Sequence, residues 1–310
     1  MKNLVADGMQ ACAITDHGWM AGVIEFYEEC NKAGIKPILG VEAYITESPD
    51  GLSNEDKIRD NMHMVLLAKD NEGYVRLMET VSNASLTNFY YKPRISIENL
   101  DYLSGHIVAT TACLGGITAK QLNFNKDENG VARACTDDEG KAIKMIERMT
   151  KIFGDDFYLE VQGWDSADKF QSTYNSWVIT TAQKMSIPLV ITADAHYLTL
   201  KDHELHELIM AMQMSIPIQK YRENSDFLYG PHFYVAGHEE MERRAKKIGA
   251  ESSFHNTIDI ANKCNVTLKL GEYQEPVFPI TETDDYEEFK QWKETSYGIN
   301  ARHQDSCGVP

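Results

Sequence analysis

Short apolar runs alternate with amphipathic segments between residues 10 and 192, and this rhythm constrains the fold more than any other feature. Six runs have the length and composition of β-strands, and they are 10–15, 35–46, 63–69, 106–111, 156–162 and 187–192. The second run fits either two strands or one bent strand. Apolar residues at helical spacing mark the segments 19–33, 71–87, 138–153 and 167–186. Gly34 and Gly154 follow two of these segments, where a helix would end. Regular alternation of this kind predicts an α/β fold with a mostly parallel sheet, either open or closed into a barrel.

Two parts of the chain depart from the rhythm. The polar segment 123–140 is rich in Asp and Asn, so we expect an exposed loop there. From about residue 200 the pattern is helical without further strong strands, and the polar last thirty residues contain one amphipathic stretch.

Charge and hydropathy limit the partners of this chain. Its 47 acidic and 30 basic side chains give a formal charge of −17, which repels phosphate backbones, so we expect weak nucleic-acid binding by the chain alone. No apolar run approaches the roughly 18 residues that span a bilayer, and residues 1–10 lack a secretory apolar region. We therefore expect a cytoplasmic protein without a membrane partner. The six cysteines form no CxxC pair, which favours reduced thiols.

Potential metal ligands gather near the ends of the predicted strands. The loops at the carboxyl ends of parallel strands converge, so side chains there can form one site. His63 is the weakest of them because it begins its strand. The candidates are Asp16, His17, Glu42, His63, Cys113, Asp194 and His196. Imidazole, carboxylate and thiolate ligands together suit Zn²⁺, Mn²⁺ or Fe²⁺, and clustered divalent ions would suit phosphoester hydrolysis.

Each candidate also has a plainer interpretation when taken alone. A histidine at a strand end is more often a hydrogen-bonded structural residue, and Cys113 alone would be a small buried apolar residue. Asp194 and His196 are the strongest pair, because residues two apart in an extended chain point to the same side. His203 and His206 are better explained as part of a solvated helix face. Only the joint pattern favours a metal site.

Six blocks of the sequence, in order, resemble one known family. They are ACAITDHGWMAGVIEFYEECNKAGIKPILGVEAYI, HMVLLAKDNEGYVRLMETVSNA, FYYKPRISIENL, GHIVATTACLGG, FYLEVQ and DAHYLTLKDHELHELIMAMQ. These blocks resemble the PHP (polymerase and histidinol phosphatase) domain family, and within it the branch at the N-terminus of bacterial DNA polymerase III alpha subunits. The resemblance covers about residues 1–280, and the run 233–279 is similar to the segment that leads into the polymerase palm in that branch.

The resemblance implies a distorted seven-stranded β/α barrel of PHP type, here lacking its first strand and followed by a mostly helical connecting segment. The expected divisions are the PHP domain at 1–222, the connecting segment at 223–280, and a linker with the start of a truncated polymerase region at 281–310. It also implies a parent protein that replicates DNA, with DNA and other replicase subunits as partners. Metal-dependent 3′–5′ exonuclease or phosphoesterase chemistry belongs to the intact family.

The same resemblance implies a ligand set for divalent ions, whether Zn²⁺, Mn²⁺ or Mg²⁺. Asp16 is expected to orient its neighbours without binding metal. Arg94, in KPRIS, is expected to face phosphate, and an ordinary surface arginine is an equal alternative. The implied ligands are His17, Glu42, His63, Cys113, Asp194 and His196. The family's first strand carries an HxH pair and the next turn an acidic ligand, and this sequence begins downstream of both.

The remaining ligands are unevenly divided among the family's three ion positions. Glu42, His63 and Cys113 make a full set for one ion, whereas the other two positions keep Glu42 with Asp194 and His17 with His196. Two ligands rarely hold a divalent ion tightly in water. We therefore expect one well-bound ion at most and little or no hydrolysis.

Three functions remain open from the sequence. The first is the PHP part of a replicative polymerase, whose palm active site this chain does not contain. The second is a free-standing metal-dependent phosphoesterase, against which the run 231–279 argues. The third is a non-catalytic structural module of a split polymerase.

Overall fold

The computed structural model describes residues 1–48, 52, 55, 60–122, 125–126, 132–133, 136–163, 169–223 and 230–272. The chain divides into two compact units, Met1–Thr267 and Leu268–Pro310. Every element named below belongs to the first unit. The boundaries expected at residues 222 and 280 remain predictions.

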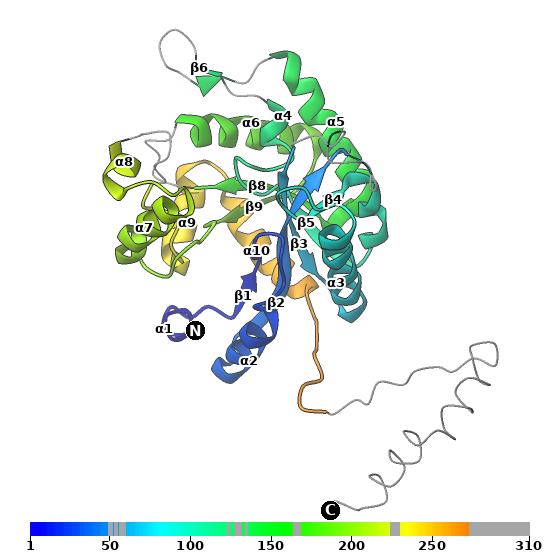
Figure 1. Cartoon of the computed structure of the whole chain (residues 1–310), viewed down its shortest axis with the longest axis vertical. Helices are drawn as coiled ribbons and strands as arrows, with labels where there is room; N and C mark the ends of the chain where they lie inside the picture. Colours follow the sequence, from blue (N-terminus) through cyan, green and yellow to red (C-terminus); the bar gives the residue numbers. More distant parts are fainter. Residues whose placement is uncertain are drawn as a thin grey trace, which may run out of the picture. The chain divides into compact units, whose positions relative to one another are not determined.

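A curled seven-stranded sheet forms the centre of the first unit (Figure 1). Its main order is β1-β2-β3-β5-β8-β9, and β4 also pairs with β2. The bounds are β1 Ala11–Ile14, β2 Lys36–Thr46, β3 Met62–Ala68, β4 Arg94–Ser96, β5 Ile107–Thr110, β8 Phe157–Gln162 and β9 Leu189–Thr192. Neighbouring strands are parallel except at β3, which runs antiparallel to both β2 and β5. The expected α/β fold with a mostly parallel sheet is confirmed, in the form of a half-barrel of PHP type.

All six predicted strands are present, and the run 35–46 is one continuous strand. Strand β4 was not predicted, because three residues are too few to show a periodic pattern.

Helices surround the sheet on the outside of its curl (Figure 1). They include α1 Lys2–Ala6, α2 Val23–Ala33, α3 Asn71–Leu86, α4 Ala119–Leu122, α5 Thr136–Phe153 and α6 Lys169–Met185. Helix α2 ends at Gly34, which takes the left-handed φ of 72° that glycine adopts without steric cost. Helix α3 begins after Asp70, whose side chain accepts a 2.8 Å hydrogen bond from the Gly73 N–H. The four predicted helical segments are therefore confirmed.

The chain after residue 200 is helical, as expected. Its helices are α7 His203–Gln213, α8 Ile218–Glu223, α9 His238–Lys247 and α10 Glu251–Lys263. The loop expected at 123–140 is wrong in part. Asn125–Lys126 (β6) pairs with Ala132–Arg133 (β7), α5 already begins at Thr136, and the rest of the segment lies outside the described residues. Acidic residues such as Asp137, Asp138 and Glu139 also favour the first turn of a helix, which explains the error.

Helix α10 seals one end of the half-barrel. Ile260 and Cys264 share a core cluster with one buried residue from each of five strands, namely Ile38, Leu67, Val108, Tyr158 and Val190. The Lys36 Nζ donates to the Ala261 carbonyl at 2.6 Å, and the Asn256 Nδ2 donates to the Leu189 carbonyl at 2.6 Å. Both bonds lie where a parallel strand starts. Helix α10 therefore covers the amino ends of the parallel strands. A functional site can form at the opposite edge, where the parallel strands end.

Candidate metal centre

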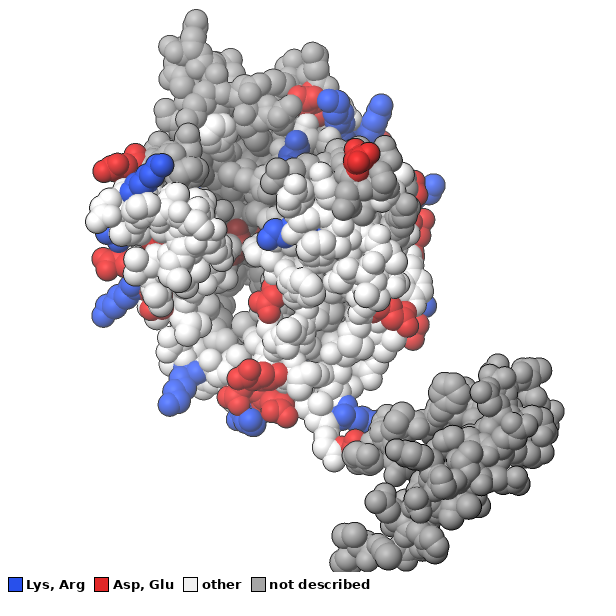
Figure 2. Space-filling model, viewed as in Figure 1, with Lys and Arg blue, Asp and Glu red and all other residues white. Residues whose placement is uncertain are grey.

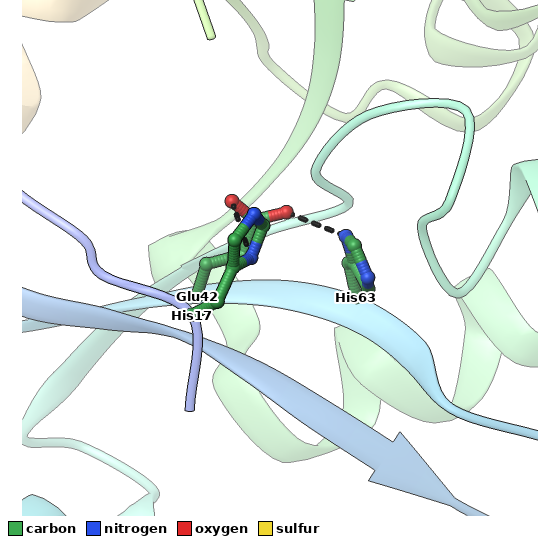
Figure 3. A group of neighbouring side chains, drawn as sticks. All are labelled: His17, Glu42 and His63. Atoms are coloured by element: carbon green, nitrogen blue, oxygen red, sulfur yellow. Dashed lines mark hydrogen bonds and ion pairs between the residues drawn. The ribbon is translucent and has the colours of Figure 1, made fainter. Parts of the chain in front are cut away.

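Three predicted ligands from three different segments meet at the carboxyl end of the sheet (Figure 3). His17, Glu42 and His63 each place one ligand atom within 4.8 Å of the other two. The Glu42 Oε1 lies 2.8 Å from the His63 Nδ1, and the Glu42 Oε2 lies 3.6 Å from the His17 Nδ1. The buried Glu42 carboxylate therefore lies between two imidazoles.

The backbone around Glu42 fixes His17 in this place. Strand β1 ends at Ile14, but the chain stays beside β2: the Glu42 N–H donates to the Asp16 carbonyl at 3.1 Å, and the Gly18 N–H donates to the Glu42 carbonyl at 2.9 Å. Gly18 has a φ of +70°, and a Cβ there would lie 2.9 Å from the Pro93 side chain. Asp16 thus supports Glu42 through its main chain. Its expected role without metal binding remains a prediction.

His63 reaches the site because of the direction of β3. The sequence pattern counted against it, since it begins its strand. Because β3 is antiparallel to its neighbours, its first residues lie at the edge where the parallel strands end. The His63 N–H donates to the Gly115 carbonyl at 2.9 Å, and the His63 carbonyl accepts from the Ile117 N–H at 3.0 Å. These bonds attach the loop after β5 to the start of β3.

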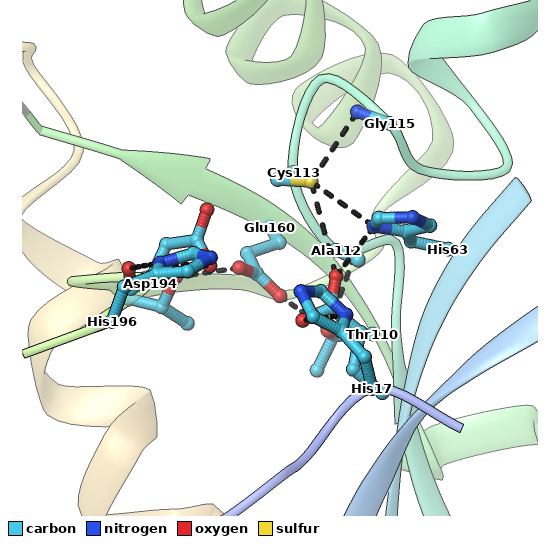
Figure 4. A network of polar contacts seen from close by, with 11 residues as sticks. His17, His63, Thr110, Ala112, Cys113, Gly115, Glu160, Asp194 and His196 are labelled. Atoms are coloured by element: carbon cyan, nitrogen blue, oxygen red, sulfur yellow. Dashed lines mark hydrogen bonds and ion pairs between the residues drawn. The ribbon is translucent and has the colours of Figure 1, made fainter. Parts of the chain in front are cut away.

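That loop carries Cys113 to the same cluster (Figure 4). The Cys113 Sγ lies 3.6 Å from the His63 Nδ1 and 3.9 Å from the Glu42 Oε1, and it accepts from the Gly115 N–H at 3.3 Å. Burial raises the pKa of the Cys113 thiol well above its usual range, and the charges of Asp194 and Glu42 raise it further. The thiol therefore stays protonated near neutral pH unless a cation binds it.

In the view of Figure 4, Asp194 and His196 lie on one side of Glu160 and His63 lies on the other. The reason given for this pair in the sequence analysis is wrong. Strand β9 ends at Thr192, and Asp194 has a left-handed φ of 47°, so the chain between the two residues is not extended. Both residues nevertheless lie close to the candidate ligands, since the His196 ring centroid lies 5.8 Å from that of His17.

One hydrogen bond sets the tautomer of His196. Its Nδ1 lies 2.8 Å from the Asp194 carbonyl oxygen. A carbonyl oxygen can only accept, so the Nδ1 carries the hydrogen and the Nε2 keeps its lone pair. This is the arrangement in which a neutral imidazole binds a metal through Nε2.

A buried acid that the sequence analysis did not single out forms the floor of the site. Glu160 lies in β8, only 3% exposed, and its carboxyl group accepts from the Thr110 hydroxyl and, at 2.5 Å, from the Thr192 hydroxyl. Figure 4 shows it between Cys113 and Asp194. The clue was an acid inside the apolar run FYLEVQ, since acids in fully buried strands are rare.

Burial and nearby negative charge raise the pKa of two of the carboxyl groups in the site. Burial, with added repulsion from Glu42, raises the pKa of Asp194 to about 6. Burial, and secondarily the charges of Asp194 and Glu42, raise the pKa of Glu160 to about 7. Burial also tends to raise the pKa of Glu42, but the His63 hydrogen bond and the His17 charge bring it below its ordinary value. A divalent cation bound among such crowded carboxyl groups would offset the repulsion between their negative charges.

Arg94 is buried in β4, and the structure places it among structural partners. Its guanidinium donates to the Asn88 side-chain oxygen at 3.2 Å and to the Thr46 hydroxyl at 3.3 Å, and it lies 3.5 Å from the Asp60 carboxylate. Its side chain is 0% exposed, so the alternative of an ordinary surface arginine is wrong. These contacts join three segments of the chain. A phosphate contact by Arg94 remains a prediction.

The expectation that His203 and His206 form a solvated face is wrong. Both are half-buried on the inner side of α7, and the His203 Nδ1 lies 3.3 Å from the Tyr197 hydroxyl. The outward side carries apolar residues instead, with Leu205 58% and Met212 77% exposed. The sequence pattern shows two faces on a helix, and the usual assumption that the apolar face is inside fails here.

Comparisons with known proteins agree with this geometry. The family model for the PHP domain matches residues 1–163. The chain belongs to the PHP domain family. The sequence resemblance, the half-barrel and the candidate ligands at the carboxyl ends of the strands agree with this membership.

Several curated relatives carry the name DNA polymerase III subunit alpha. The one from Helicobacter pylori is 36% identical over 266 residues, covering 86% of this chain and 21% of the relative. Those from Borreliella burgdorferi and Aquifex aeolicus are 33% and 32% identical, covering 87% and 88% of this chain and 22% and 23% of the relatives. The chain thus spans about a fifth of the length of the relatives it matches. A solved structure of a candidate metal-dependent phosphoesterase from Bifidobacterium adolescentis is 15% identical, covers 62% of this chain and 79% of its own, and has a TM-score of only 0.33.

Proposed function

We propose that this chain is the PHP part of a DNA polymerase III alpha subunit and binds one divalent ion through Glu42, His63 and Cys113. One observation carries the proposal: a carboxylate, an imidazole and a thiol from β2, β3 and the loop after β5 converge, with the Cys113 Sγ 3.6 Å from the His63 Nδ1. The parent protein would act in DNA replication in the cytoplasm, with DNA and other replicase subunits as partners.

The donor set fits a zinc or manganese ion. Zn–S and Zn–N bonds of about 2.3 and 2.0 Å at a tetrahedral angle place sulfur and nitrogen about 3.5 Å apart. The observed separation of 3.6 Å between the Cys113 Sγ and the His63 Nδ1 is close to this value. The Glu42 carboxylate supplies the third donor, and its second oxygen lies toward His17.

Such an ion would lower the pKa of a bound water and polarise a phosphoryl oxygen. The protein's own residues have separate tasks. Glu42 orients the His63 and His17 imidazoles, and Cys113 must lose its proton when it binds. Asp194, with a pKa raised to about 6 by burial, can hold or release a proton near neutral pH within the same site.

We expect hydrolysis by this chain to be weak. Beyond the set of Glu42, His63 and Cys113, the further pairs are Glu42 with Asp194 and His17 with His196. A pair of protein ligands binds an ion weakly, and the two-ion clamp of phosphodiester cleavage needs a second ion held in place.

The experiment compares 3′-labelled single-stranded DNA with a small phosphomonoester, each incubated with the chain and Mn²⁺ or Zn²⁺. Release of 3′ nucleotides that Cys113→Ser abolishes would support phosphodiester chemistry at this site. Cys12→Ser is the matched control, since the Cys12 Sγ contacts only its neighbour's carbonyl among the described hydrogen bonds. Cleavage of the monoester alone would contradict the polymerase assignment and favour a free-standing phosphoesterase.

A structural role for the ion is the second candidate, and one observation favours it. The loop 111–117 is attached to His63 by backbone bonds, and Cys113 in that loop would add a metal bond to the same residue. An ion would then fasten β3 to the loop after β5. Inertness on both substrates, together with a melting temperature that Zn²⁺ raises and Cys113→Ser lowers, would establish this role.

Nucleic-acid binding by the chain alone is proposed to be weak. On the face that Figure 2 shows, the Lys and Arg side chains of the described residues are scattered among Asp and Glu side chains without a continuous basic patch. The formal charge of −17 acts in the same direction. Within the same described part, no helix combines the length and apolarity needed to cross a membrane.

A further inference from the structure

The loop 89–93, which precedes β4, lies at the rim of the metal centre. Because β4 pairs in parallel with β2, this loop runs beside the strand that carries Glu42. A Cβ on Gly18 would lie 2.9 Å from the Pro93 Cγ, and Gly18 directly follows His17. The loop 89–93 therefore contacts the segment that carries His17.

Lys92, in this loop, places a positive charge next to His17. The Lys92 Nζ lies 5.4 Å from the centroid of the Tyr44 ring. The same ring stacks on the His17 imidazole at a centroid distance of 6.0 Å and an interplanar angle of 25°. Burial lowers the pKa of His17, and the Lys92 charge contributes to that lowering. Lys92 is thus an exposed cation that a cation–π contact with a buried ring holds beside the site.

A phosphate group needs a cation to approach this metal centre, because the centre is acidic. Glu42, Glu160 and Asp194 all place carboxyl groups there. Arg94, the arginine of the KPRIS segment, is 0% exposed and bonded to structural partners. Lys92 is the exposed cation of the same segment, and lysine binds phosphate as a point charge.

Tyr91 stands at the tip of the loop in a strained backbone conformation. Its φ is 61°, in the left-handed region that bulky residues rarely adopt. The Tyr90 N–H donates to the Lys92 carbonyl at 3.0 Å, which closes the turn around it. The Tyr91 side chain is 63% exposed, and Trp19, two residues after His17, is 51% exposed. Strained residues are concentrated at functional sites, and exposed aromatic rings are the surfaces on which single-stranded nucleic acids stack.

We propose that Lys92 and Tyr91 bind the end of a single-stranded nucleic acid at the rim of the metal centre, Lys92 through a backbone phosphate and Tyr91 by stacking on a base. The inference rests on the proposed function and names the substrate class of that site. A small phosphomonoester without a base would use Lys92 alone, so the two contacts together select a nucleic-acid strand. Binding through one phosphate and one base is weak, in keeping with the negative charge of the chain.

The test is fluorescence anisotropy of a 5′-labelled oligothymidylate, titrated with the Zn²⁺-loaded chain at several salt concentrations. We expect Lys92→Met to weaken binding and to reduce the slope of log affinity against log salt by about 0.7, the value for one phosphate contact on a single strand. Lys92→Arg keeps the charge and the contact with an aromatic ring, and should bind as the wild type does. Lys184→Met, at an exposed position of α6, makes the same change of charge and should leave the slope unchanged.

Tyr91→Gly separates binding from folding. Glycine adopts a φ of 61° without strain, so the melting temperature should stay close to that of the wild type. The affinity for the oligonucleotide should fall about fivefold or more, because one stacked base is lost. Tyr91→Phe keeps the ring and should retain the affinity.

An unchanged salt slope in Lys92→Met, or an unchanged affinity in Tyr91→Gly, would overturn the proposal. A wild type that does not bind the oligonucleotide would overturn it as well. The same titrations in EDTA compare the variants without metal, where we expect the same differences at lower overall affinity. If the wild type binds no ion, the proposed function fails, and the titrations in EDTA still decide the roles of Lys92 and Tyr91.

Discussion

Glu160→Gln gives the sharpest test of the buried acid beneath the metal centre. Burial raises the pKa of Glu160 from an ordinary 4.5 to about 7, so the folded chain favours the protonated form. Glutamine has the same size and stays neutral. Its amide can accept from the Thr110 or the Thr192 hydroxyl and donate to the other, so both contacts can survive the substitution.

The size of the stability difference follows from the pKa of Glu160, which is 4.5 in the unfolded chain and about 7 in the folded chain. Below about pH 4 the acid is protonated in both the folded and unfolded chain, and burial costs nothing extra. Between pH 4.5 and 7 the unfolded chain loses the proton while the folded chain keeps it, so the wild type loses stability as pH rises. Each pKa unit is worth 1.36 kcal/mol, so the loss reaches about 3 kcal/mol above pH 7. Glu160→Gln should avoid that loss.

The assay is urea unfolding of the EDTA-treated chain at pH 4.5, 6 and 8. Glu160→Gln should match the wild type at pH 4.5 and exceed its free energy of unfolding by about 3 kcal/mol at pH 8. Glu147→Gln, at an exposed position of α5, controls for the substitution itself. A stability difference that stays flat from pH 4.5 to 8 would refute the reasoning, because Glu160 would then ionise as easily in the folded chain as in the unfolded one.

Three further predictions follow from single contacts. Gly116→Ala should destabilise the chain by about 3 kcal/mol or more in urea unfolding, because its Cβ would lie 1.9 Å from the Thr111 carbonyl oxygen. The control is Gly140→Ala, in open space in α5, which should stabilise the chain by about 1 kcal/mol. Arg94→Met should cost about 3 kcal/mol in the same assay, because it removes the buried guanidinium that pairs with Asp60 and donates to Asn88. Weaker phosphate binding at unchanged stability would instead support the predicted phosphate contact. Zn²⁺ affinity measured by chelator competition should rise with pH, because burial raises the pKa of the Cys113 thiol that must lose its proton. The much weaker Zn²⁺ binding left in Cys113→Ser should show little of that pH dependence.

Much of the fold was predictable because apolar residues recur at different spacings in strands and in helices. Six apolar runs of strand length and four segments of helical spacing all appear as expected, and Gly34 ends α2 in the left-handed conformation. Strand direction was not predictable. No local pattern shows that β3 is antiparallel, and this is why His63 was undervalued.

The site was predictable only where a ligand type coincided with a strand end. His17, Glu42, His63 and Cys113 do converge, as the joint pattern indicated. Glu160 was missed because it lies within a strand, and its meaning depends on the buried hydroxyls of Thr110 and Thr192 from two other strands. Which face of α7 points inward depends on the segments that cover each face of the helix. The spacing of apolar residues alone does not reveal these segments.

The number of tightly bound ions tests the central claim most directly. Metal analysis of the chain, loaded with Zn²⁺ and dialysed against buffer, should find one ion per chain. The ion should be lost in Cys113→Ser and kept in Cys12→Ser. Three ions per chain, or one ion that survives Cys113→Ser, would contradict the assignment of a single site to Glu42, His63 and Cys113.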